Sequence, residues 1–186
     1  MNSEITDRRI VEMIKGTTIN LRVIERSDLE QLRSWWNNPE LRGMEDVFLP
    51  VTVPQMEKKY SDWLEQKDAL HLVIEKIDGS RLLGKCTIYT GYAGVDLLLA
   101  EKDSEPEKTA LESLELVKSY LFLEGRGYNN MAMWIPSWNE WLLAIAGKSG
   151  MRLAGRVRRT GMREGKYHDT VVYDLLKEEY MASKRT

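Results

Sequence analysis

The sequence has few of the residues that cross-link a protein, bind metals or anchor it in a membrane. Its single cysteine, Cys86, stands in an apolar strand-like run, which excludes a disulfide framework and favours a reducing compartment. The two histidines, His71 and His168, are far apart and lack the spacing of metal ligands, so we expect structural roles for both and no metal site. No segment approaches the roughly 18 consecutive apolar residues of a membrane span.

Positive charge is not in excess either. The chain has 27 Lys and Arg against 29 Asp and Glu, a net charge of −2. Proteins that bind nucleic acid usually carry a basic excess, so the overall charge gives no argument for such a partner, although basic residues gather between Arg152 and Arg163. The first residues lack the apolar core of a secretory signal. We therefore expect a soluble cytoplasmic protein with no nucleic-acid or membrane partner.

A length of 186 residues suits one domain with a full hydrophobic core. We expect an N-terminal extension over residues 1–16, a single domain over 17–180 and a tail over 181–186. Apolar residues among the charges of the extension predict a short helix that leads to Gly16.

The first half of the domain predicts a strand, two helices and an antiparallel meander. Alternation predicts a strand over 18–24, and apolar spacing predicts helices that begin at Ser27-Asp28 and cover 54–67. The meander strands are expected over 71–77, 82–89 and 95–100, with a hairpin turn at Asp78-Gly79.

The second half alternates between helices and strands. A capping box of Ser104 and Glu107 predicts the start of a long helix that ends at Gly125. Further elements are expected as a strand over 130–135, a helix over 140–148, and strands over 151–159 and 168–177 around a turn at 161–166. Because a helix joins strand 95–100 to strand 130–135, these two strands should be parallel in a mixed α/β sheet that is otherwise mostly antiparallel.

Four segments carry a family resemblance: INLRVIERSDLEQLRSWWNNPELR, HLVIEKIDGSRLLGKCTIY, WIPSWNEWLLAIAGKSGMRLAGRVRR and GKYHDTVVYDLLKEEY. In this order they make the chain resemble the GCN5-related N-acetyltransferases over about residues 17–180, and most of all the branch that acetylates ribosomal proteins, polyamines and amino sugars. The resemblance implies the acyltransferase fold of that family, acetyl-CoA as co-substrate, and a small-molecule or peptide primary amine as acceptor.

In that family acetyl-CoA lies in a V-shaped cleft between the strands that match 95–100 and 130–135. The pantetheine arm follows the first strand, and the diphosphate lies on a loop before the next helix. The resemblance therefore assigns the co-substrate to Leu98, Leu99, Lys108, Thr109, Ala110 and Asn139.

The diphosphate loop departs from the family pattern. Lys108 replaces a glycine, Glu105 replaces Gln or Arg, and Glu101, Asp103 and Glu107 add further carboxylates. Two interpretations stay open: a working site that uses the loop lysines, or an ordinary acidic first turn that complements the helix dipole.

The tyrosine that commonly protonates the departing thiolate falls on Ala146. A positioned acid contributes about 10²–10⁴ in rate, so its loss needs a replacement or a slower reaction. The candidates near it in the chain are Ser137, Ser149, Tyr128 and Tyr167.

Two carboxylates are candidates for the catalytic base, Asp96 in strand 95–100 and Glu75 in the meander. Alternation puts Asp96 on the same side as Leu98 and Ala100. If that side faces the cleft, Asp96 is placed to take a proton from an amine; otherwise it is a solvent-facing strand residue.

Aromatic and acidic residues of the early helices are candidates for binding the acceptor. Indole faces attract ammonium groups, and carboxylates pair with them. The predicted acceptor residues are Trp35, Trp36, Glu40 and Trp63, with Glu45 and Asp46 nearby. The alternative for these aromatics is ordinary helix–sheet core. Trp138 and Trp141, which flank Asn139, either pack on pantetheine or fill the cleft.

Three functions remain open from the sequence. The first is an N-acetyltransferase in which the amine attacks acetyl-CoA directly in a ternary complex. The second is a binding or regulatory protein of the same fold that has lost diphosphate binding. The third is an acyl-CoA or acyl-carrier-protein user that holds the phosphates loosely. We also expect a possible homodimer, in which the exposed final strand pairs across the interface.

Overall fold

The computed structural model describes residues 13–38, 40–41, 49–101, 105–123 and 127–185. In this part of the chain an eight-stranded sheet has the order β1-β2-β3-β4-β5-β6-β8-β7. Every neighbouring pair is antiparallel except β5 and β6, which are parallel, so the predicted mixed α/β sheet is confirmed. The strands are β1 (Met13–Lys15), β2 (Ile19–Val23), β3 (Ala69–Lys76), β4 (Leu82–Tyr89), β5 (Gly94–Leu99), β6 (Asn130–Pro136), β7 (Arg152–Arg163) and β8 (Lys166–Leu176).

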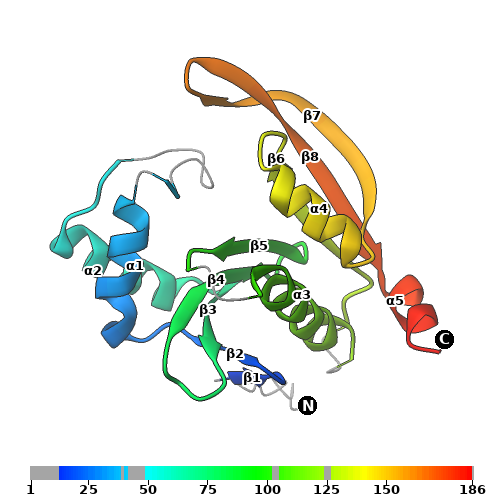
Figure 1. Cartoon of the computed structure of the whole chain (residues 1–186), viewed down its shortest axis with the longest axis horizontal. Coiled ribbons are helices and arrows are strands. Elements are labelled where there is room, and N and C mark those ends of the chain that lie inside the picture. Colours follow the sequence, from blue (N-terminus) through cyan, green and yellow to red (C-terminus); the bar gives the residue numbers. More distant parts are fainter. Residues whose placement is uncertain (1–12, 39, 42–48, 102–104, 124–126, 186) are drawn as a thin grey trace, which may run out of the picture.

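The described helices connect these strands and cover both faces of the sheet (Figure 1). They are the short 3₁₀ helix η1 (Arg26–Asp28), α1 (Leu29–Asn37), α2 (Val53–Glu65), α3 (Pro106–Phe122), α4 (Glu140–Lys148) and α5 (Lys177–Ser183). Thr52 caps α2, since its side chain accepts a hydrogen bond from the backbone N–H of Gln55. In return, the side-chain oxygen of Gln55 accepts a hydrogen bond from the backbone N–H of Thr52.

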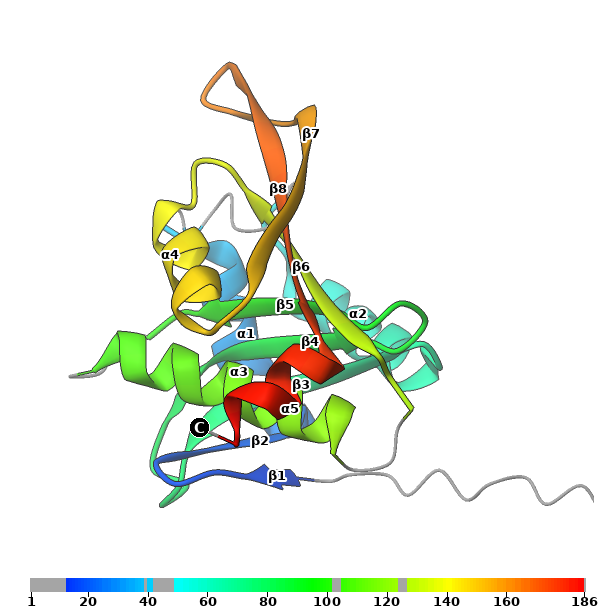
Figure 2. The same cartoon turned by 90° about the vertical axis from the view of Figure 1, so that its right-hand side faces the viewer.

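Alternate side chains of β3 pack into two separate hydrophobic cores. Leu72 and Ile74 are fully buried in the larger core, to which α3 and α4 contribute. Val73, between them, is fully buried in the smaller core, to which α1 and α2 contribute. Full burial of a residue of this size stabilises a fold by about 1.5–3 kcal/mol. The helices are thus held on opposite faces of the same strands (Figures 1 and 2).

At the ends of the domain, one predicted element is wrong and one helix was not predicted. Met13–Lys15, predicted as the end of a helix, is a strand in which Ile14 is buried and its neighbours are exposed. Residues 1–12 lie outside the described part. The predicted strand 168–177 gives way to helix α5 at Lys177, which extends into the predicted tail. Tyr180 holds this helix against the core, because its hydroxyl donates to Glu115 at 2.7 Å.

The C-terminal hairpin differs from expectation in length and position. β7 runs through the predicted turn to Arg163, and the hairpin projects beyond the body of the molecule (Figure 2). β8 lies between β6 and β7, so the final strand is not the exposed edge that we expected. The edge is β7, which has two bulges and exposed arginines, features that oppose pairing with another chain. The homodimer stays a prediction.

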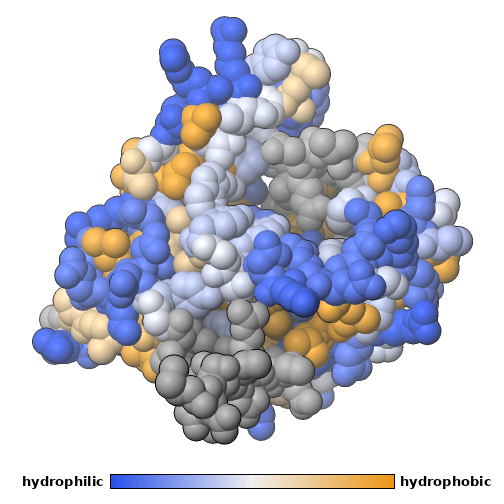
Figure 3. All heavy atoms as spheres, turned by 180° about the vertical axis from the view of Figure 1, so that it is seen from behind, coloured by the Kyte–Doolittle hydropathy of each residue, from blue (hydrophilic) through white to orange (hydrophobic). Residues whose placement is uncertain are grey.

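The surface at this end mixes hydrophilic side chains with isolated hydrophobic ones (Figure 3). Leu153 and Met162 of β7 are exposed. Elsewhere, no helix within the described ranges combines the length and the apolar character that crossing a lipid bilayer requires.

Candidate functional site

The sheet opens between its two parallel strands. Within the described residues their pairing is confined to Gly94 opposite Ala132, where the N–H of Ala132 donates to the carbonyl of Ala93 at 3.0 Å. Beyond this point β5 and β6 separate, and the β6-facing edge of β5 has no strand beside it. An uncovered strand edge offers backbone N–H and C=O groups to a ligand.

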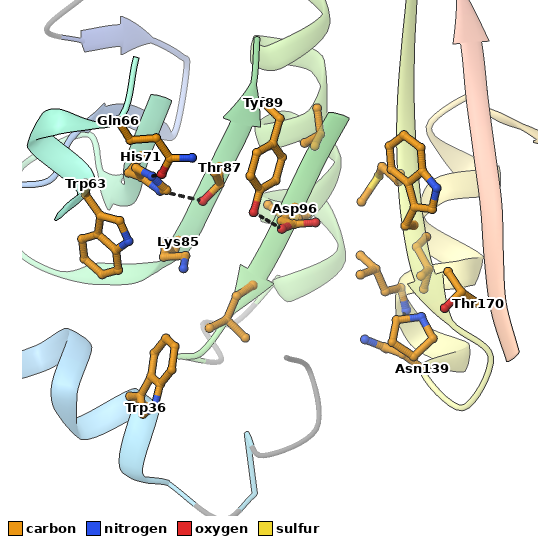
Figure 4. A pocket seen from close by; sticks show the side chains of 18 of the residues that line it. Trp36, Trp63, Gln66, His71, Lys85, Thr87, Tyr89, Asp96, Asn139 and Thr170 are labelled. Carbon is orange, nitrogen blue, oxygen red and sulfur yellow. Dashed lines mark hydrogen bonds between the residues drawn. The ribbon is translucent and has the colours of Figure 1, made fainter. Parts of the chain in front are cut away.

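A cavity of about 510 Å³ fills the space that this separation creates (Figure 4). One wall is formed by β4 and β5, and the facing wall by β6 and the start of α4. The third wall comes from α1, α2 and β3, through residues that include Trp36, Trp63 and His71.

Strand register places three polar side chains in one row across β3, β4 and β5. His71 lies opposite Thr87, and Thr87 lies opposite Asp96. Because side chains on one face of neighbouring strands lie close together, the row presents one polar stripe to the cavity. Asp96 is exposed there, and the hydroxyl of Tyr89 donates to its Oδ2 at 2.9 Å (Figure 4). Of the two positions open for Asp96, the structure has the cleft-facing one, while its role as a base remains a prediction.

Glu75, the other predicted base, lies on β3 in a structural ion-pair network. Its carboxylate accepts from Arg22 at 3.0 Å, and the guanidinium of Arg22 also makes two bonds to Asp28, at 2.8 and 2.9 Å. Hydrogen bonds and charge from Asp28 and then Glu75 outweigh burial and raise the pKa of Arg22. Glu75 is not among the described residues that line the cavity, so the geometry favours Asp96.

His71 and Tyr89 line the cavity although neither was a predicted site residue. The Nε2 of His71 is 2.9 Å from Oε1 of Gln66, and its Nδ1 is 3.2 Å from Oγ1 of Thr87. Because an amide oxygen only accepts, Nε2 carries the hydrogen in this arrangement. The lack of metal spacing in the sequence had favoured a purely structural histidine. The only sequence signal for these residues is that the two neighbouring strands alternate.

The start of α4 forms part of the facing wall. Asn139 is buried, and its side-chain oxygen accepts from the N–H of Leu142 at 3.1 Å, as an N-cap does. Since that oxygen is committed to the helix, the amide nitrogen is the group that remains to donate to a ligand. Asn139 lines the cavity (Figure 4). Leu98 also lines it from β5, and contact of either residue with a co-substrate stays a prediction.

The other predicted co-substrate residues are placed differently. Leu99, Thr109 and Ala110 are buried, with Leu99 and Ala110 in the larger core. Lys108 is exposed and lines a separate open groove along α3, as Glu107 does.

The first turn of α3 is acidic and its lysines are paired. The N-cap is Glu105, one residue after the predicted position, and its side chain makes no capping hydrogen bond. Ser104, on which the predicted capping box depends, lies outside the described residues, as Lys102 and Asp103 do. Lys108 pairs with Glu105 at 3.1 Å, and Lys148 from α4 pairs with Glu107 at 2.7 Å.

None of the four candidates for the missing acid lines the cavity in the described structure. Tyr128 donates to the carbonyl of Thr90 at 3.0 Å, and Ser149 donates to that of Ala146 at 2.8 Å. Ser137 accepts from the backbone of Asp169, and Tyr167 is exposed on the hairpin. The phenol in the cleft is Tyr89.

The predicted acceptor residues divide into two groups. Trp36 and Trp63 line the cavity, and the indole N–H of Trp36 donates to the carbonyl of Leu49 at 3.1 Å. Trp35 is buried in the smaller core, where its N–H donates to Glu101 at 2.8 Å. Glu40 is exposed and is not among the described lining residues.

Glu45 and Asp46 lie outside the described residues. The Cζ of Arg163 lies 4.3 Å from the ring centroid of Trp138, and Trp141 is partly exposed. Neither is among the described lining residues, so both differ from the packing expected on either interpretation.

No protein-family model matches the sequence, and a search of curated proteins found no match. Solved structures match almost the whole chain. RimL, a ribosomal L7/L12 alpha-N-protein acetyltransferase in complex with coenzyme A, has a TM-score of 0.75 at 16% identity, over 89% of this chain and 98% of that one. A probable acetyltransferase has 0.76 at 24% identity, over 90% and 98%. Spermidine N-acetyltransferase from Vibrio cholerae, in complex with CoA and spermine, has 0.72 at 15% identity, over 88% and 98%.

These matches show that the chain has the fold of the GCN5-related N-acetyltransferases, as the four sequence segments predicted. At such identities the likeness concerns the fold alone. What the cleft does must be argued from its own residues.

Proposed function

We propose that this protein is an N-acetyltransferase that moves an acetyl group from acetyl-CoA to a primary amine in the cleft between β5 and β6. The observation that carries the proposal is the separation of these strands around a cavity that contains Asp96 and Tyr89. Similar structures, those of RimL and of spermidine N-acetyltransferase, are complexes with coenzyme A, which supports the same use of the fold here.

The pantetheine arm of acetyl-CoA fits the cleft. The arm contains two amides, and amides pair with an uncovered strand edge such as that of β5 beyond Gly94. Leu98 on one wall and Leu142 on the other offer apolar contacts, and the amide nitrogen of Asn139 offers a donor. We infer that the arm and the acyl group supply most of the binding free energy.

The diphosphate fits less well. The first N–H groups of α3 are suited to an anion, but Glu105 and Glu107 occupy the same turn. Lys108 and Lys148 already neutralise those carboxylates. We therefore propose that the phosphates are held loosely.

The chemistry requires two proton movements. When the amine nitrogen attacks the thioester carbon, it must lose a proton, and the departing sulfur must gain one. In this proposal Asp96 accepts the amine proton, and Tyr89, hydrogen-bonded to Asp96, is the phenol nearest to supply one.

Direct attack by the amine is favoured over an acyl-enzyme. Cys86 is fully buried, and this burial, with a smaller contribution from Asp96, raises the pKa of its thiol to about 12. Since the thiolate is the reactive form, this thiol is a poor nucleophile.

A second candidate function is a non-catalytic binding protein. The observations that favour it are the fully buried Ala146 at the usual tyrosine position and the acidic first turn of α3. Such a protein would bind a ligand in the cleft without transferring an acetyl group.

Thermal unfolding with acetyl-CoA, followed by an assay of amine acetylation, separates these functions. Ligand at 100 times its Kd should add about 2.7 kcal/mol to the free energy of unfolding. Leu98→Trp, which fills the cleft, should abolish the shift, and Leu153→Trp, at an exposed site on β7, should leave it unchanged. No shift and no product would overturn the proposal. A shift without acetylation of any amine would support the non-catalytic alternative.

A further inference from the structure

The acceptor side of the cleft is more basic than the sequence suggested. Among the described residues that line the cavity, the charged side chains outside histidine are Lys59 from α2, Lys85 from β4 and Asp96 from β5. Both lysines are half-buried. Glu40, one of the acidic residues expected to attract an amine, is exposed and is not among the described lining residues, while Glu45 and Asp46 lie outside the described part of the chain.

The two indoles of this wall are already covered by ammonium groups of the chain itself. The Nζ of Lys59 lies 4.2 Å from the ring centroid of Trp36, and the Nζ of Lys85 lies 5.4 Å from that of Trp63. Both distances are within the range of cation–π contacts. A second cation approaching these rings would meet like charge, so the wall is unsuited to a polyamine.

Lys59 differs in its position from its neighbour Lys58 on α2. Lys58, next to Lys59, is exposed and pairs with Asp62 one turn further on, at 2.8 Å. That is an ordinary surface ion pair. Lys59 instead faces the cavity, where the polar groups of Gln66 and His71 also lie.

Sheet register places Lys85 and Asp96 near each other on one face of the sheet. Lys85 lies opposite Leu98, and Asp96 is two residues before Leu98 on β5, so Lys85 and Asp96 are diagonal neighbours on one face. The Cα atoms of diagonal neighbours are separated by about 7–8 Å, and a long lysine side chain can bring its charge closer to the carboxylate than that. A ligand that contacts both must carry opposite charges only a few bonds apart.

Building on the proposed function, we propose that the acceptor is a small primary amine that also bears a carboxylate or a phosphate. Lys59 and Lys85 bind the anionic group and so determine specificity, while the amine is directed to Asp96. A cavity of about 510 Å³ is of the size that holds small molecules.

The test measures kcat/KM for acetyl transfer to amines of similar length that differ in their second group: 4-aminobutyrate, 2-aminoethyl phosphate, 1,4-diaminobutane and 1-aminobutane. We expect the anionic amines to exceed the diamine by about tenfold or more, since each ion pair in a partly desolvated site favours them. The carboxylate and phosphate arms show which anion is preferred.

The variants assign this preference to the two lysines. Lys85→Met and Lys59→Met should each reduce the ratio of kcat/KM between the anionic amines and the diamine, by up to about tenfold. The reduction should come mainly from the acceptor KM, and the KM for acetyl-CoA should stay unchanged. Lys85→Arg should retain it, and Lys58→Met, the matched control on the outer face of α2, should change nothing.

Two results would overturn the inference. If the diamine or 1-aminobutane is acetylated as well as the anionic amines, the inference fails and the proposed acetyltransferase stands. If the double variant Lys59→Met with Lys85→Met keeps the preference, the anion is bound elsewhere and the inference also fails. Absence of acetyl transfer to every amine, without binding of acetyl-CoA, would overturn both.

Discussion

The cleft between β5 and β6 and the first turn of α3 are neighbouring regions that differ in how well their side chains suit a ligand. In the cleft, strand separation, the polar row from His71 to Asp96 and the cap at Asn139 together form the site that we propose for acetyl-CoA and the amine. The turn of α3 has the geometry of an anion site, but Glu105 and Glu107 occupy it and are paired with lysines. The comparison shows that a helix N-terminus is suited to a phosphate only where side-chain charge permits it.

The largest effect is expected from the cleft. Asp96→Asn should lower kcat by about 10²–10⁴, because the amide cannot accept the proton of the amine. Glu75→Gln is the matched control on β3, where the same change weakens only the pair with Arg22. It should lower the melting temperature without changing kcat. The reverse pattern would place the base on β3.

A further carboxylate of α3 tests whether the acidic residues of this helix serve structure. Glu112 accepts hydrogen bonds from the backbone and side chain of Thr18 and from the backbone of Thr17. Burial opposes its charge, but these hydrogen bonds prevail, so the pKa of Glu112 is lowered from 4.5. Glu112→Gln should cost about 1.5–3 kcal/mol at neutral pH, the range for hydrogen bonds to a charged group.

The pH dependence of this effect has a fixed sign. A lowered pKa in the folded state means that the stabilisation is fully present above the unfolded pKa and is lost as the pH falls through the folded value. Melting curves of the wild type and Glu112→Gln should therefore differ at neutral pH and converge below about pH 4.5. A difference that persists at low pH would contradict this assignment.

At the start of α4, Asn139→Ala should cost about 0.5–2 kcal/mol of stability through loss of the cap. It should also weaken the binding of acetyl-CoA, because the side chain lines the cleft. Asn139→Asp keeps the cap and removes the amide donor, so it should retain stability but still weaken binding. Calorimetric titration together with thermal melting checks both readouts. Equal binding by all three proteins would remove Asn139 from the site.

The smallest effects are expected at the first turn of α3. Lys108→Glu should change the Kd for acetyl-CoA only a few-fold, because Lys108 is exposed and already paired with Glu105. Replacing Glu105 and Glu107 by Gln should tighten binding by about 0.3–1 kcal/mol, the range for charges near a helix N-terminus. Loss of all binding in Lys108→Glu would mean that the diphosphate depends on this turn after all.

Much of the fold followed from local pattern. Strands β3 to β5 show clear alternation and a strong Asp78-Gly79 turn, and the helix between β5 and β6 predicted their parallel pairing. Local pattern did not predict β1 or α5. Met13–Lys15 is a strand only through its pairing with β2, and α5 is held by the contact of Tyr180 with the core.

The site was less predictable than the fold, since it depends on which distant residues meet. Alternation left two positions open for Asp96, and the packing of Val95 and Leu97 in the larger core put it on the face that lines the cavity. The indoles of Trp36 and Trp63 were expected to bind an amine, but Lys59 and Lys85 come to them from other elements. No sequence spacing indicated that approach, so the acceptor that we propose differs from the one that the sequence predicted.

The central claim is that the cleft, rather than the first turn of α3, carries the binding of acetyl-CoA. The most direct test is calorimetric titration of the protein with acetyl-CoA and with S-acetylpantetheine, which lacks the diphosphate. The account predicts that the two Kd values differ by no more than about tenfold, or roughly 1.4 kcal/mol, and that Leu98→Trp weakens both. Binding of acetyl-CoA without measurable binding of S-acetylpantetheine, or binding unaffected by Leu98→Trp, would contradict it.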